Sequence, residues 1–386
     1  MPKLIRITTV PMSLKLLLPG QMRYMSEQGF EVVMVSSDGP EREHVIVNEK
    51  CPHVVIPMTR SITPLQDIRS LVALYRLFKK EKPDIVHSHT PKAGLLSMVA
   101  AKMAGINVRI HTIAGLRFQT TSGLTRRVLV GMEKLTAASA THVWPNSESL
   151  IAYIRQHRLV AESKLAVIAK GSSNGIDLTR FNRESLSSDG IERAKAIAGY
   201  EPGLIYLLVV GRLVKDKGIS ELAVAFETLA RKEPKLRLLL IGGMEEKLDP
   251  LDPHTLNIIN TNPAIIVAGW RNDVENYMAF ASMLVHPSYR EGFPNVILQA
   301  GALGLPVICS RIEGNIDLVT DKETGMLFEA KNVLSLEHCL TYAILHPEEI
   351  NVFASQLSQK VKNYYNRSFI HESIKNKYLA ILNAGT

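Results

Sequence analysis

The stretch 282-SMLVHPSYREGFPNVILQAGALGLPVICS-310 contains a complete strand–helix–strand pattern. Its first apolar run ends at Pro287, a polar loop follows, and Pro294 opens a segment with apolar residues at helical spacing. A second apolar run begins at Leu305. Short buried strands that alternate with helices are typical of parallel sheets covered by helices on both faces. The stretch therefore predicts an α/β fold.

The same alternation runs through the chain of 386 residues and restarts after about residue 200, where "LIYLLVVGRL" begins a second series of strands. The polar segment "NRESLSSDGIERAKAIAGYEPG" separates the two series and is typical of a domain boundary. A chain of this length exceeds one ordinary core. We therefore predict two doubly wound, Rossmann-like domains that face each other across a cleft, at residues 1–185 and 186–386. The terminal helix either stays with the second domain or crosses back to the first.

The composition excludes several classes of protein. Apolar residues make up 46% and aromatic residues 6%, which disfavours fibrous and disordered chains. The three cysteines are too few and too far apart for a disulfide framework, so we expect a reducing compartment. The early apolar runs are interrupted by Pro11, Lys15 and Pro19, and no run reaches about 18 apolar residues. We expect neither a signal peptide nor a membrane span, and a cytoplasmic location.

The charge is distributed unevenly between the two halves. Residues 1–190 carry a net charge of +10, and residues 191–386 carry −2. A basic half is suited to an anionic membrane surface, a phosphorylated substrate or nucleic acid. No basic block is interleaved with aromatic residues, so we do not expect a nucleic-acid partner.

Two segments that follow predicted strands have the residues of an anion-binding site. Ligands of open parallel sheets bind beyond the carboxyl ends of the strands, and the free N–H groups of a helix start attract anions. Glu291 stands in such a loop, and Gln299 lies about one turn inside the following helix. In "GRLVKDKG", Arg212 and Lys217 follow another strand and are suited to a diphosphate. The alternative for this octapeptide is a solvated loop with ordinary surface cations.

"GRLVKDKG", followed about seventy residues later by "HPSYREGFPNVILQA", resembles the signature of retaining, nucleotide-sugar-dependent glycosyltransferases of the GT-B fold. This family includes glycogen-synthase-like and mannosyltransferase-like enzymes. "VHSHTPKAG", "HTIAG", "PNSESL" and "SSNGIDLTRF" are similar to weaker landmarks of the family. They narrow the resemblance to bacterial enzymes that build capsule or lipid-linked surface polysaccharides.

The resemblance implies a role for each matching residue. Glu291 contacts the transferred sugar, and His111 lies near the donor sugar and the acceptor; these two are the catalytic candidates. The donor-binding candidates are Gly211, Arg212, Lys217, Gly292, Phe293, Pro294, Asn295 and Gln299. The acceptor-side candidates are His89, Lys92 and Arg117.

Two positions depart from the family pattern. Gln299 occupies the place of a glutamate that binds the ribose, so we expect donor affinity about tenfold lower, because hydrogen bonds to charged groups are stronger than neutral ones. The alternative is that Gln299 contacts no ligand. Ala114 replaces a second histidine, which leaves the role of His111 open. For His89 and His111, a role in packing or in lining a cleft is favoured over a role as metal ligands.

The implied enzyme is a hexosyl- or N-acetylhexosaminyltransferase that uses a nucleotide sugar, UDP-linked by family frequency, and retains the anomeric configuration. No Asp-x-Asp is present, so we expect neither a metal nor another cofactor. The expected acceptor is a carbohydrate, lipid-linked, at an anionic membrane surface. The basic clusters Lys79, Lys80, Lys82 and Arg126, Arg127 are candidates for a peripheral contact, or else solvated helix faces. The alternatives are a nucleotide-sugar epimerase of the same fold and a non-catalytic nucleotide-sugar-binding relative.

Overall fold

The computed structural model describes residues 1–245 and 249–384 and divides into two compact units. The first unit comprises Met1–Gly175 together with the C-terminal helix, and the second comprises Ile176–Asn366. The boundary therefore lies before the predicted one, because Ile176 and Phe181 belong to the core of the second unit. The structure thus places the terminal helix with the first unit.

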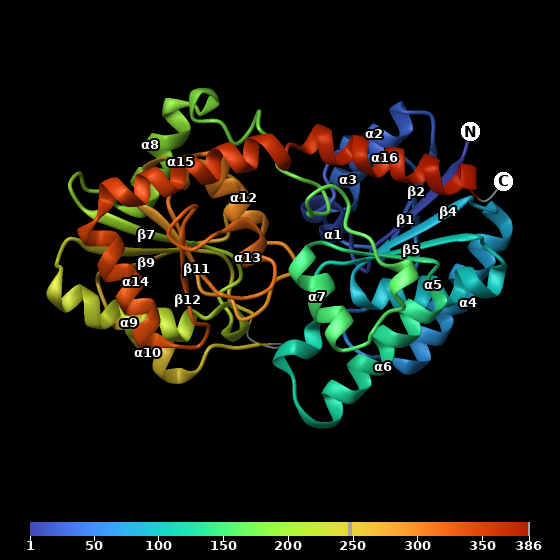
Figure 1. Cartoon of the computed structure of the whole chain (residues 1–386), viewed down its shortest axis with the longest axis horizontal. Coiled ribbons are helices and arrows are strands. Elements are labelled where there is room, and N and C mark those ends of the chain that lie inside the picture. The colour runs from blue at the N-terminus through green and yellow to red at the C-terminus, as the bar shows by residue number, and fades with distance from the viewer. Residues whose placement is uncertain (246–248, 385–386) are drawn as a thin grey trace. The chain divides into compact units, whose positions relative to one another are not determined.

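The first unit contains a six-stranded parallel sheet in the order β3-β2-β1-β4-β5-β6 (Figure 1). Its strands are β1 (Lys3–Ile7), β2 (Glu31–Ser36), β3 (His53–Val55), β4 (Ile85–His89), β5 (Val108–Ile113) and β6 (His142–Pro145). Its helices are α1 (Pro11–Leu17), α2 (Gln21–Glu27), α3 (Arg42–Glu49), α4 (Pro64–Glu81), α5 (Pro91–Ala104), α6 (Gly123–Ser139), α7 (Glu148–Gln156) and α16 (Arg367–Ala384).

The second unit repeats this topology, with the sheet order β12-β11-β10-β7-β8-β9 and all strands parallel. Its strands are β7 (Ile205–Val210), β8 (Leu236–Ile241), β9 (Ile265–Gly269), β10 (Met283–His286), β11 (Val307–Ser310) and β12 (Met326–Phe328). Its helices are α8 (Ser188–Ala198), α9 (Ile219–Lys232), α10 (Pro253–Thr261), α11 (Val274–Phe280), α12 (Asn295–Ala302), α13 (Asn315–Leu318), α14 (Val333–Leu345) and α15 (Pro347–Tyr364).

Each sheet is buried on both faces, as the apolar strands predict. In β1, Leu4 packs into a cluster with residues of α1, α2 and α16, while Ile5 and Ile7 pack into a cluster with α4 and α5. In the second unit, one cluster includes α11, α12 and α15, and the other includes α9 and α14. Figure 1 shows α2 and α16 on one face of the first sheet with α4 and α5 on the other, and α12 and α15 on the face of the second sheet opposite α9 and α14. Successive strand side chains point to opposite faces, so continuous apolar runs fit this arrangement.

Candidate active site

The strand order of the second unit defines where a ligand is expected. β7 and β10 are neighbours, but the chain continues from β7 to β8 on one side and from β10 to β11 on the other. In doubly wound sheets this switch point leaves a crevice beyond the carboxyl ends of the two strands. Lys217 lies in the short 3-10 turn Lys215–Lys217 after β7, and Glu291 follows β10. The predicted residues therefore lie at the switch point.

Close backbone contacts hold the two segments together. Gly218 adopts a φ of +66°, and a Cβ there would lie 2.0 Å from the carbonyl oxygen of Pro287. The Tyr289 N–H also donates to the Asp216 carbonyl at 2.9 Å. The turn after β7 can therefore pack directly against the exit of β10, and this contact needs glycine because any side chain would collide with the backbone.

The central feature of this site is an ion pair between the Lys217 ammonium and the Glu291 carboxylate. His286, at the end of β10, lies 3.1 Å from the same carboxylate oxygen through its Nε2. The side chains of Glu291 and His286 are 16% and 7% exposed. An ionised carboxylate can only accept, so we assign the Nε2 proton to His286, which donates it to Glu291.

The charges in this trio follow from its surroundings. Burial works to raise the pKa of Glu291, but the charge of Lys217 and the His286 hydrogen bond outweigh it and hold the pKa below its ordinary value. Burial lowers the pKa of His286 despite the opposing effect of Glu291. The site therefore presents an ionised carboxylate, an ammonium group and a neutral imidazole at neutral pH. Sequence reasoning missed His286, although it ends the apolar run that precedes the Glu291 loop.

The other predicted donor-site residues occupy the same edge of the sheet in different surroundings. The Arg212 guanidinium pairs with Glu245 and not with the Glu291 trio. Gly211 is close to the loop after β8, since a Cβ on Gly242 would lie 1.7 Å from its carbonyl oxygen. Gly211 and Arg212 therefore lie near the carboxyl end of β8, which is separated from β10 by β7.

The loop before α12 is largely buried. Gly292, Phe293 and Pro294 are buried, and the Phe293 ring lies 5.2 Å from that of Tyr365. Pro294 is the N-cap residue and not part of the first turn. No side chain of the described residues caps this helix, and the Ile297 N–H already donates to the Pro294 carbonyl at 3.1 Å. The N–H groups of Asn295 and Val296 are therefore the ones available to an anion.

Gln299 is half-buried on α12, and its side-chain amide makes no hydrogen bond within residues 1–245 and 249–384. Both its donor and its acceptor groups are therefore available to a ligand. The predicted loss of donor affinity at this position stays a prediction.

The histidine candidates of the first unit are enclosed. A Cβ on Gly94 would lie 2.3 Å from the His111 ring, so His111 packs closely against α5. His111 also contacts the Ser88 hydroxyl at 2.9 Å through Nδ1, and burial lowers its pKa to about 4. His111 is therefore neutral and fixed in place. Its catalytic role stays a prediction.

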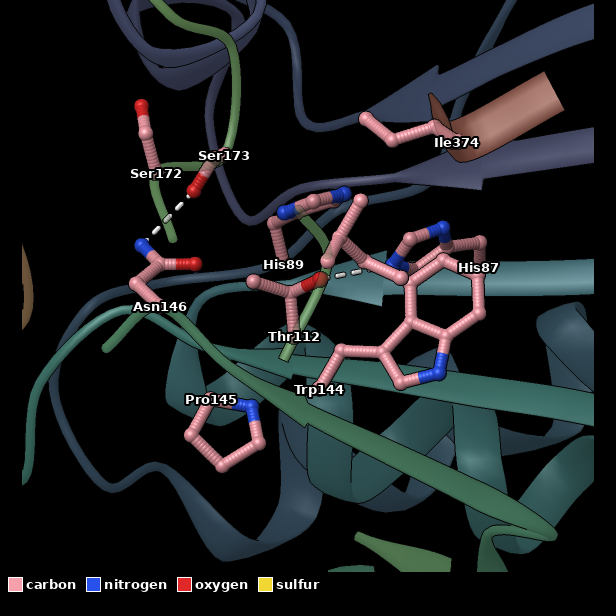
Figure 2. A pocket seen from close by; sticks show the side chains of 10 residues that line it. His87, His89, Thr112, Trp144, Pro145, Asn146, Ser172, Ser173 and Ile374 are labelled. Carbon is pink, nitrogen blue, oxygen red and sulfur yellow. Dashed lines mark hydrogen bonds between the residues drawn. The ribbon is translucent and has the colours of Figure 1, made fainter. Parts of the chain in front are cut away.

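His89 borders a small hollow with His87, Thr112, Trp144, Asn146, Ser172 and Ser173 (Figure 2). Its ring stacks on His87, and its buried Nε2 has no hydrogen-bond partner among the described residues. Thr90, the next residue, has a φ of +76°, which is strained for a β-branched residue. Its hydroxyl lies 2.8 Å from that of Thr9, so the end of β4 is held against the end of β1.

Lys92 and Arg117, the other acceptor-side candidates, differ in exposure. Lys92 is buried and pairs with Asp67 at 2.6 Å, whereas Arg117 is exposed at the start of the 3-10 turn Arg117–Thr120. The structure therefore assigns Lys92 to an internal contact and leaves Arg117 open to solvent.

Two family comparisons cover most of the chain. Residues 191–362 match the family described as glycosyl transferases group 1, and residues 19–171 match the glycosyl transferase 4-like domain. The capsular polysaccharide biosynthesis glycosyltransferase CapM of Staphylococcus aureus is 33% identical over 384 residues, which cover 98% of this chain and 97% of CapM. The chain therefore belongs to the group 1 glycosyltransferase family, as the motifs predicted.

A further relative agrees with this assignment, and two solved structures share the fold. The UDP-Gal:alpha-D-GlcNAc-diphosphoundecaprenol alpha-1,3-galactosyltransferase of Escherichia coli is 29% identical, over 83% of this chain and 82% of that enzyme. The structure of Anabaena HepE in complex with UDP and glucose has a TM-score of 0.80 at 17% identity, over 98% of this chain and 100% of that chain. Sucrose-phosphate synthase from Thermosynechococcus elongatus has a TM-score of 0.81 at 19% identity, with all of both chains covered. The fold is GT-B.

The described residues contain neither a candidate membrane span nor a cluster of metal-ligating side chains. No helix there combines the length and the apolar character that a membrane span requires. No group of three or more His, Cys, Asp or Glu side chains in residues 1–245 and 249–384 is arranged to hold a metal ion.

Proposed function

We propose that this protein transfers a hexose or N-acetylhexosamine from a UDP-linked donor to a lipid-linked carbohydrate, with retention of the anomeric configuration, in bacterial surface polysaccharide synthesis. The observation that carries the proposal is the Lys217–Glu291–His286 trio at the switch point of β7 and β10. The names of two relatives support the substrates: one is a UDP-galactose-dependent enzyme acting on a diphosphoundecaprenol-linked sugar, and another is an N-acetylgalactosaminyltransferase acting on a diphospho-undecaprenol-linked sugar.

In this proposal the donor diphosphate lies against Lys217 and the first N–H groups of α12. These positive groups stabilise the charge that develops on the leaving diphosphate. Arg212 adds a further cation when it leaves Glu245 for the phosphate. Because Lys217 then divides its contacts between the phosphate and Glu291, binding of the diphosphate also orients the Glu291 carboxylate toward the sugar hydroxyls.

The acceptor hydroxyl attacks the anomeric carbon from the face that the leaving group occupies. The bond to the diphosphate oxygen breaks, and the departing phosphate takes the proton of the acceptor hydroxyl. Glu291 stays ionised, because its pKa is held low, and accepts hydrogen bonds from the transferred sugar. No step needs a metal ion, since Lys217, Arg212 and the helix N–H groups supply the positive charge. We expect EDTA to leave the rate unchanged.

A contact with an anionic membrane surface is part of the proposal. Residues 122–128, at the start of α6, are all exposed, and they include Arg126, Arg127 and the apolar side chains Leu124 and Val128, 76% and 43% exposed. Lys79, Lys80 and Lys82 are exposed at the end of α4. Basic and apolar side chains together suit the interface of an anionic bilayer, where each cation contributes about 1 kcal/mol.

The test is a thermal-shift panel of nucleotide sugars, followed by a transfer assay with the best donor and a prenyl-diphosphate-linked sugar. We expect stabilisation by one or more UDP-sugars and a glycosylated lipid product whose anomeric configuration matches that of the donor. Epimerisation of the donor without an acceptor would instead identify an epimerase. Donor binding without transfer to any acceptor would identify a non-catalytic relative.

A further inference from the structure

A pocket in the first unit lies beyond the carboxyl ends of β3, β4 and β5, at the edge where open sheets bind ligands. Its empty space, about 480 Å³ when the open mouth is included, is continuous with solvent. α5 packs between α4 and α6 (Figure 1). The lining of the pocket includes Pro91 and Lys92, at the N-terminal end of α5. Its lining also includes Arg60, Ile62, Arg117, Leu129, Met132 and Glu133.

One side of the pocket is held in place by Lys92. Its ammonium donates to the Asp67 carboxylate at 2.6 Å, to the Thr59 hydroxyl at 3.2 Å and to the Ser61 carbonyl oxygen. These contacts fix the 59–63 loop, which carries Arg60 and Ile62. Because Asp67 neutralises it, Lys92 is a positioning residue and contributes little net charge to a ligand.

The charge that a ligand would meet comes from Arg60 and Arg117. Both side chains line the pocket and are exposed, and neither pairs with a carboxylate within the described part of the chain. Two guanidinium groups without anionic partners favour a ligand with a phosphate or diphosphate, which they can bind through two parallel hydrogen bonds each.

The rest of the pocket is apolar. Leu129 and Met132 of α6 line it together with Ile62, which is 56% exposed. The one carboxyl group there, Glu133, has no hydrogen-bond partner among the described residues, and burial raises its pKa to about 7. At neutral pH this group is therefore about half ionised and offsets only part of the charge of the two arginines, so the pocket combines apolar walls with a net positive rim.

We propose that this pocket binds the prenyl diphosphate part of the acceptor, with the diphosphate on Arg60 and Arg117 and the first isoprene units on Ile62, Leu129 and Met132. The inference rests on the proposed function, because it assigns the part of the acceptor that carries no sugar. An amphiphilic pocket is required for such a ligand, since a purely cationic surface would bind inorganic diphosphate as well as the lipid.

The experiment is isothermal titration with farnesyl diphosphate as the probe. We expect Arg60→Gln and Arg117→Gln each to weaken binding about tenfold or more, as the loss of a charged hydrogen bond does. Arg76→Gln, an exposed arginine of α4 that does not line the pocket, is the matched control and should bind as the wild type does. Inorganic diphosphate and farnesol should each bind at least tenfold more weakly than farnesyl diphosphate.

The pocket assignment would be wrong if both arginine variants bound farnesyl diphosphate as the wild type does, or if inorganic diphosphate bound as tightly as farnesyl diphosphate. It would also be wrong if short-chain phosphatidylglycerol displaced the probe, because that result would identify a phospholipid headgroup site. Measurement of UDP-sugar binding by the same variants distinguishes a failure of the pocket assignment from a failure of the proposed function. If UDP-sugars stabilise and transfer proceeds while the arginine variants bind the probe normally, the pocket assignment alone is wrong. If the arginine dependence is found but no UDP-sugar binds, the proposed function is wrong and the pocket remains.

Discussion

Lys217 and Glu291 lie 74 residues apart in the chain and form an ion pair beside the junction of β7 and β10. Each belongs to a different sequence motif, and each motif follows a different strand. His286 contacts the same carboxylate, so the Glu291 carboxylate interacts with both the Lys217 ammonium and the His286 imidazole. Loss of the Lys217 charge therefore removes one of the interactions that hold the pKa of Glu291 low.

Removal of the Glu291 charge should affect turnover more than nucleotide binding. We expect Glu291→Gln to lower kcat by about 10²-fold or more, as the loss of one transition-state contact does. UDP affinity should stay the same or rise, because Lys217 is released for the phosphate. Glu275→Gln, which removes the partner of Arg180 elsewhere in the unit, is the control and should keep full activity. Wild-type turnover in Glu291→Gln would reject the assignment.

Removal of the Lys217 charge should weaken both the donor and free UDP. A charged hydrogen bond contributes about 1.5–3 kcal/mol, so Lys217→Met should bind UDP about 10- to 150-fold more weakly in titration calorimetry. Uridine should bind both proteins equally, because it has no phosphate. Lys215→Met, an exposed lysine in the same turn, is the matched control. The role of Lys217 would be wrong if UDP bound Lys217→Met normally.

Gln299→Glu tests the departure from the family pattern. The amide is half-buried and makes no hydrogen bond in the described structure, so a carboxylate there could accept from both ribose hydroxyls. We expect UDP-sugar affinity to rise by up to about tenfold, or at least to be preserved. A measured loss of affinity would show that the site is adapted to a neutral side chain.

The raised pKa of Glu133 predicts how stability depends on pH. Its pKa is about 7 in the folded protein, against an ordinary value of 4.5, so the folded state binds more protons between these two pH values. Stability must therefore fall as pH rises from 4.5 to 7. Urea unfolding of the wild type and Glu133→Gln should show this extra loss in the wild type alone. We expect about 1–2 kcal/mol, less than the full shift implies, because Glu133 is only half-buried and water screens part of its charge. Parallel pH curves for the two proteins would contradict the prediction.

Membrane contact predicts a dependence on lipid charge and on salt. The protein should sediment with liposomes that contain anionic lipid, and less so at high ionic strength, because salt screens the attraction. Arg126→Gln with Arg127→Gln should weaken this binding without changing UDP affinity. The control is Arg231→Gln with Lys232→Gln, an exposed basic pair on α9. Equal partition onto neutral and anionic liposomes, or onto neither, would favour an acceptor in solution.

The two sheets and the position of Glu291 after a strand were predictable from the sequence because they depend on local patterns. The apolar run Met283–His286 and the helical spacing after Pro294 each act within about ten residues, so local patterns determined them. The motifs also identified Lys217. By contrast, the boundary at Ile176 was missed, because the segment that follows it packs into a core formed by residues far away in the chain.

By itself, the sequence determined the α/β class, the family and most of the candidate residues, since periodicity and motif spacing are properties of short segments. The tertiary structure alone decided which of those residues meet. In the folded chain His286 and Lys217 both contact the Glu291 carboxylate, whereas Arg212 pairs with Glu245. The tertiary structure also paired Lys92 with Asp67 inside the first unit, and it placed Arg60 and Arg117 beside an apolar wall with no anionic partner among the described residues. Pairing of side chains depends on strand order and close backbone packing, and neither can be read from any one segment.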